Sequence, residues 1–100
     1  MDLATVQVSD FEPLLDQTFR ADLAGQVFNL TLVEAQAARH RRNKPGARAP
    51  FALLFQGPVD VDFTQGVFPL THESLGTLEI FLVPVDREDD GRIVLQAVFG

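Results

Sequence analysis

The residues whose types are best suited to catalysis are His72, Glu73 and Ser74, which form the only local trio in the sequence that could support a nucleophilic mechanism. A serine nucleophile needs an adjacent base that a third group holds in place. On an extended strand His72 and Ser74 would share a face. However, the residues around Ser74 have turn composition, and no G-x-S-x-G motif surrounds it. The sequence therefore favours a hairpin turn over a hydrolase site.

Two groups of acidic residues deserve testing as metal or acid–base sites. Residues 86–91 match the first half of a twelve-residue calcium-binding loop. The twelfth position of such a loop carries an acidic residue that binds calcium through both oxygens, but Ala97 stands there in this chain. Asp60 and Asp62 would project on one side of an extended segment, yet nothing in the sequence brings another acid to them. The chain also lacks a glycine-rich phosphate loop and cysteine. We expect no catalytic residue, no metal site and no cofactor.

Charge is unevenly distributed along the chain. The whole chain carries −6, whereas residues 39–48 carry +5 and leave −11 on the other 90 residues. This basic stretch has no hydrophobic periodicity and includes a Pro-Gly pair, so we expect an exposed loop. It is either simply solvated, or docks against an acidic surface such as another copy of the chain, or contacts phosphate. The acidic total argues against nucleic acid. The predicted partner-binding residues here are Arg39, Arg41, Arg42, Lys44 and Arg48.

The elements that must position these residues are mostly strands. With 100 residues, 46% of them hydrophobic, the chain is long enough for one domain with a core, which we place at residues 1–100. A capping box at Ser9 and Glu12 predicts a short helix over residues 9–16. Period-two alternation predicts six strands, near residues 19–24, 27–34, 51–55, 68–72, 78–83 and 93–99. Turn residues predict hairpins at Gly25 and at residues 89–91.

Six strands without a long amphipathic helix predict an all-β fold, a small antiparallel barrel or sandwich. The nine phenylalanines, with no tyrosine or tryptophan, indicate core packing. Several strands are apolar on both faces, notably residues 80–83. Such strands occur either in a tightly closed barrel or where another chain covers one face.

The last strand is a second candidate surface for a partner. Ile93, Leu95 and Val98 give it apolar side chains on both faces. At a sheet edge it would template pairing with another chain. In a closed barrel it would pair within its own chain, beside the strand at residues 78–83 and an N-terminal strand. We therefore predict a protein partner or self-association, with these three residues contributing.

No targeting or membrane segment is evident. The N-terminal residues lack the basic and apolar regions of a secretory signal, and no apolar run approaches about 20 residues. We expect no membrane insertion and cytoplasmic synthesis, with export only by a signal-free route or as part of a phage-like particle.

The chain resembles the domain-of-unknown-function family 6916 in five segments, which are residues 48–58, 65–72, 75–76, 80–85 and 97–99. The resemblance implies a short bacterial protein, often encoded near proteins similar to phage tail collar or fibre components, and transfers no catalytic residue. We therefore expect a non-enzymatic structural or interaction subunit of a phage-tail-like or other extracellular assembly. The alternative is a small β-barrel that binds an apolar ligand, which would contain an apolar cavity of about 300 Å³ or more.

Overall fold

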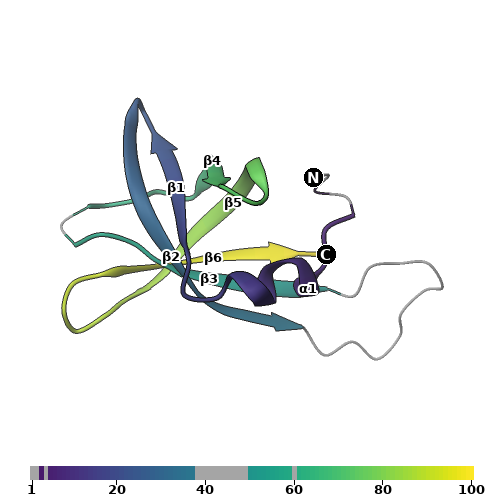
Figure 1. The fold of residues 1–100 in the computed structure, drawn as a ribbon. Coiled ribbons are helices and arrows are strands. Elements are labelled where there is room, and N and C mark those ends of the chain that lie inside the picture. The colour runs from purple at the N-terminus through teal and green to yellow at the C-terminus, as the bar shows by residue number, and fades with distance from the viewer. Residues whose placement is uncertain (1–2, 4, 38–49, 60) are drawn as a thin grey trace.

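A computed structural model describes residue 3 and residues 5–37, 50–59 and 61–100 (Figure 1). Two short helical segments come first, α1 (Val8–Phe11) and the 3₁₀ turn η1 (Glu12–Leu14). Six strands follow: β1 (Thr18–Leu23), β2 (Gln26–Ala37), β3 (Phe51–Gln56), β4 (Gly66–His72), β5 (Gly76–Arg87) and β6 (Ile93–Phe99). The predicted basic loop lies outside the described residues, together with Arg39, Arg41, Arg42, Lys44 and Arg48.

The six strands form a closed antiparallel barrel in the order β1-β2-β3-β6-β5-β4. The all-β prediction is thus confirmed, in its barrel form. β1 and β4 close the barrel through the shortest of its strand pairings, in which only Arg20 pairs with Thr71 and Ala21 with Leu70. Pairing stops beside Pro69, which has no N–H to donate to a strand ladder.

The two longest strands each change neighbours along their length. The first half of β2 pairs with β1 and the second half with β3, and an irregularity in register lies between Leu32 and Glu34. β5 changes likewise from β4 to β6, with an irregularity between Pro84 and Asp86. Such bulges bend a strand and allow both halves to remain paired. The bulge in β2 also reverses the alternation that the sequence predicts, so that Ala35 rather than Glu34 packs against the core.

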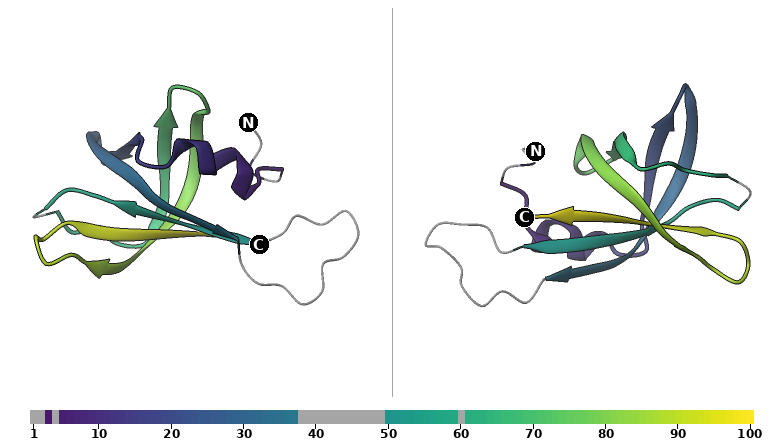
Figure 2. Two further views of the ribbon diagram at one scale, coloured as in Figure 1. Left: turned by 60° about the horizontal axis from the view of Figure 1, so that its bottom comes forward. Right: turned by 180° about the vertical axis from the view of Figure 1, so that it is seen from behind.

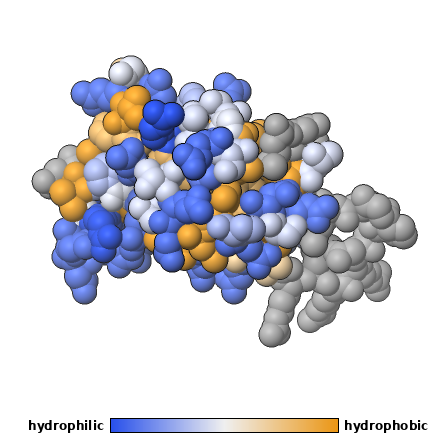
Figure 3. Space-filling view, in the orientation of Figure 1, coloured by the Kyte–Doolittle hydropathy of each residue, from blue (hydrophilic) through white to orange (hydrophobic). Residues whose placement is uncertain are grey.

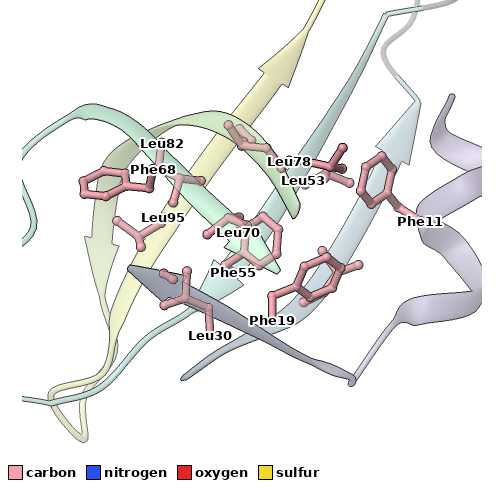
Figure 4. Close-up of a cluster of buried hydrophobic side chains, with 14 of the residues drawn as sticks. Phe11, Phe19, Leu30, Leu53, Phe55, Phe68, Leu70, Leu78, Leu82 and Leu95 are labelled. Carbon is pink, nitrogen blue, oxygen red and sulfur yellow. The ribbon is translucent and has the colours of Figure 1, made fainter. Parts of the chain in front are cut away.

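The barrel interior is filled by side chains (Figure 4). Phe19 of β1 packs edge-on against Phe55 of β3, with ring centroids 5.3 Å apart, and both rings are buried. Leu30, Leu70 and Leu95 reach the same interior from three other strands. These inward residues are the apolar members of the period-two pattern, which explains why the pattern located the strands.

One end of the barrel is closed by α1. Phe11 lies against Phe51 and Phe99, with centroid distances of 5.8 and 6.0 Å, and these two rings stack on each other at 4.5 Å. Figure 2 shows α1 near the end of β6. The short helix that the sequence predicts at residues 9–16 is present as α1 and η1, which together run from Val8 to Leu14. The reciprocal capping bond involves Gln7, whose backbone N–H donates to the Asp10 carboxylate at 2.8 Å, instead of Ser9 and Glu12.

The opposite end is closed by the loop between β3 and β4. Phe63 makes edge contacts with Phe28 of β2 and Phe68 of β4, at centroid distances of 5.6 and 5.8 Å. Gly57 lies in the same region, where an added Cβ would come within 2.8 Å of the Ile93 side chain. The loop therefore packs closely against β2, β4 and β6.

The predicted hairpin turns are both present. Ala24 and Gly25 have φ of 51° and 85°, the left-handed geometry of a two-residue turn, and the Asp22 carboxylate accepts the Gly25 N–H at 3.2 Å. At the β5–β6 hairpin Asp90 accepts the backbone N–H of Arg92 at 3.1 Å and its guanidinium Nε–H at 2.8 Å.

We expect the pKa of Asp90 to lie below its ordinary value, chiefly because the Arg92 backbone N–H donates to it and then because the Arg92 guanidinium does. A carboxyl pKa lowered by folding adds stability above the unfolded pKa, and this stability is lost as pH falls through the folded pKa. In an NMR titration of the side-chain carboxyl, Arg92→Gln should raise this pKa only part of the way. Arg20→Gln should leave it unchanged, and a complete return in Arg92→Gln would contradict the backbone contribution.

Candidate functional site

His72 ends β4 and is the one buried polar residue among the described residues, with 4% of its surface exposed. Its Nδ1 accepts the backbone N–H of Ser74 at 3.0 Å. The ring hydrogen therefore resides on Nε2, which donates to the Gln17 side-chain oxygen at 2.7 Å. Leu75 N–H also donates to the His72 carbonyl at 3.2 Å, which makes residues 72–75 a turn. The hairpin interpretation is confirmed, and both ring nitrogens have structural partners.

Gln17 is held in place by the start of the barrel. Leu32 of β2 accepts the Asp16 N–H at 2.7 Å and donates its own N–H to Gln17 at 3.1 Å. The buried Phe19 ring lies 4.8 Å from the His72 ring. Asp16 has a φ of 68°, a left-handed conformation that costs energy in a residue other than glycine. The segment entering β1 is thus fixed in a strained shape directly beside His72.

An open groove of about 600 Å³ lies next to this pair on the barrel surface. Its lining is polar and consists of Asp16, Gln17, Thr18, Arg20, Asn29, Thr71, His72 and Glu73. The sequence analysis missed this groove, because its residues come from three separate segments that meet only where β1 pairs with β2 and β4. This polar groove is not the apolar cavity that the ligand-binding alternative predicts.

Arg20 of β1 lies between the two neighbouring strands that also line the groove. It is directly opposite Asn29 on β2 and Thr71 on β4. Its side chain is exposed, and it makes no ion pair within the described parts of the chain. The carboxylates of Asp16 and Glu73 line the same groove, so its lining carries one positive and two negative charges.

Of the paired acidic candidates, the structure describes Asp62, whose side chain is fully exposed. Asp62 pairs with Arg87 at 3.2 Å, and the same guanidinium donates to the Gly91 carbonyl at 2.7 Å and the Val61 carbonyl at 3.3 Å. Arg87 thereby ties the β3–β4 loop to the β5–β6 hairpin. Asp60 lies outside the described residues. In the described parts of the chain, no three His, Cys, Asp or Glu side chains gather in a way that could hold a metal ion.

The predicted residues of the last strand divide between the interior and the surface. β6 pairs with β3 on one side and β5 on the other, so its second neighbour is not the N-terminal strand that the sequence suggested. Ile93 and Leu95 are 3% and 0% exposed and belong to the core, whereas Val98 is 71% exposed. Of the three residues, only Val98 is on the surface of the barrel.

A second apolar surface includes Phe81, from the segment 80–83 that the sequence showed to be apolar on both faces. Val67 of β4 and Phe81 of β5 are directly opposite each other and point outward, 61% and 51% exposed. Val27 of β2 is exposed as well. In the view of Figure 3, hydrophobic atoms reach the surface at several places between hydrophilic ones.

Residues 6–99 match a protein family described as a domain of unknown function, DUF6916. The chain belongs to the DUF6916 family. This confirms the resemblance seen in the sequence, and the DUF6916 match spans the whole barrel with α1. Searches of curated proteins and of solved structures found no match to the chain. Among the described residues, the DUF6916 chain has no helix of the length and apolarity that a membrane span requires.

Proposed function

We propose that this domain is a non-enzymatic interaction or structural subunit that binds a protein partner through the outside of its barrel. The observation that carries the proposal is the exposed pair Val67 and Phe81. Barrel closure accounts for the buried, inward residues of β5, such as Ile80 and Leu82. It does not account for a phenylalanine on the outer face, where burial against a partner would be favourable.

The outer surface is favoured over the interior as the binding region, because core side chains fill the barrel and aromatic rings close both ends. The finer proposal is a subunit of a phage-tail-like or other extracellular bacterial assembly. Its support is the family resemblance, which implies assembly and transfers no catalytic residue. His72 is the residue whose type best suits catalysis, and both of its ring nitrogens make hydrogen bonds within the fold.

Site-specific photo-crosslinking in the cells that make the protein tests this function. A photoreactive phenylalanine analogue at position 81, or at position 67, should give discrete protein adducts. Asp89 lies exposed at a hairpin tip and is the matched control position. The proposal fails if positions 81 and 67 give no adduct, or give the same adducts as position 89. Identification of the adduct as a component of an extracellular assembly would support the finer proposal.

A further inference from the structure

The β5–β6 hairpin contains a dipeptide that can react with itself. Asp90 is the one aspartate of the sequence that glycine follows, and neither of the two asparagines precedes a glycine. In an Asp–Gly pair the backbone nitrogen of glycine can attack the side-chain carboxyl of aspartate, because no glycine side chain hinders the approach. The attack releases water and closes a five-membered succinimide ring, in which the Gly91 nitrogen is bonded to both carbonyl carbons of Asp90.

Water then opens the succinimide ring at either of its two carbonyls. Addition at the side-chain carbonyl breaks the bond between that carbon and the nitrogen, and aspartate is restored. Addition at the main-chain carbonyl breaks the original peptide bond instead, so the chain continues through the side chain as isoaspartate, with an extra methylene in its backbone. The water lost on ring closure is regained on opening, and water is the only other reactant.

Both reacting groups are held by hydrogen bonds in the folded hairpin. The Gly91 N–H donates to the Glu88 carbonyl at 2.9 Å, and the nitrogen must lose this bond and its proton before it can attack. The Asp90 carboxylate accepts the Arg92 backbone N–H at 3.1 Å and its guanidinium Nε–H at 2.8 Å. These bonds lower the pKa of Asp90 and favour its ionised form. The ionised carboxylate is the unreactive form, because one of its oxygens must leave as water.

We propose that Asp90–Gly91 is a site of spontaneous isomerisation to isoaspartate, which Arg92 and the Glu88 carbonyl restrain in the folded protein. This modification does not depend on the proposed function. Its structural effect follows from the Gly91 carbonyl, which accepts the Arg87 guanidinium at 2.7 Å, while the same guanidinium donates to the β3–β4 loop. An extra methylene directly before Gly91 displaces this carbonyl, so isomerisation loosens the contact between the hairpin and the loop.

Ageing of the purified protein at neutral pH and physiological temperature tests the proposal. Trypsin cleaves after Arg87 and Arg92 and releases residues 88–92 as one peptide, or residues 88–100 from Arg92→Gln. Isoaspartate keeps the mass of this peptide but changes its retention time, and electron-transfer fragmentation assigns the position. The folded wild type should isomerise more slowly than the same protein in guanidinium chloride. Folded Arg92→Gln, which keeps the backbone N–H, should isomerise about five- to tenfold faster than the folded wild type, because one charge-assisted hydrogen bond is lost.

Two controls separate the effect of the fold from that of the sequence. Arg20→Gln removes an exposed guanidinium from β1 and should age like the wild type. In guanidinium chloride, the wild type and Arg92→Gln should react at the same rate, because the hairpin contacts are absent from both.

Each part of the proposal can be overturned separately. If no isoaspartate forms at position 90 even in the denatured protein, the site is rejected. Equal rates in the folded and denatured wild type would show that the hairpin does not restrain the reaction, and equal rates in folded Arg92→Gln and wild type would remove Arg92 from the proposal. Amide exchange of residues 87–93 should be faster in the isolated isoaspartate form than in the unmodified protein. Unchanged exchange would contradict the loosened contact.

Discussion

Phe11→Ala is expected to lower the free energy of unfolding by about 3–5 kcal/mol, as truncation of a fully buried phenylalanine does. Phe11 has no exposed surface and covers the stacked Phe51 and Phe99 rings at the end of the barrel. A domain of this size has only about 5–15 kcal/mol in total, so much of its stability depends on this ring. Urea denaturation followed by circular dichroism measures the loss.

Phe81→Ala is the matched control, since it removes the same ring from an exposed position. It should change stability by less than about 1 kcal/mol. Phe11→Leu should restore part of the loss, because it refills most of the cavity. A loss below about 1 kcal/mol in Phe11→Ala would show that α1 does not stabilise the barrel end.

His72→Ala is expected to lower the free energy of unfolding by about 2–4 kcal/mol. The substitution removes a buried ring that contacts Phe19 and leaves the Ser74 N–H and the Gln17 side-chain oxygen without their partner. His72→Phe keeps an aromatic ring but neither nitrogen, and should lose about 1–3 kcal/mol through the hydrogen bonds alone.

Glu73→Ala provides the control for His72, since Glu73 is its exposed neighbour in the same turn. It should leave the unfolding midpoint close to that of the wild type. Equal stability of His72→Phe and the wild type would mean that the two hydrogen bonds contribute nothing and that packing alone holds the histidine in place.

Local rules explain what the sequence by itself determined. The alternation of residues such as Leu78, Ile80 and Leu82 follows from side chains pointing to opposite faces of a strand, which needs no knowledge of the neighbouring strand. Gly25 and Gly91 mark turns because their φ angles, 85° and 94°, suit glycine. The all-β class and the hairpins could therefore be predicted. The family resemblance rests on the same local segments.

Only the tertiary structure decided between barrel and sandwich, and which strands lie beside β6. Those choices depend on bulges in β2 and β5, whose bends allow each long strand to serve two neighbours, and no local pattern specifies them. The groove around Arg20 and the outward pair Val67 and Phe81 likewise exist only through register, which joins β1 to β4 and β4 to β5. A strand's sequence shows which residues share a face, but pairing between distant segments determines what that face lies beside and what it can bind.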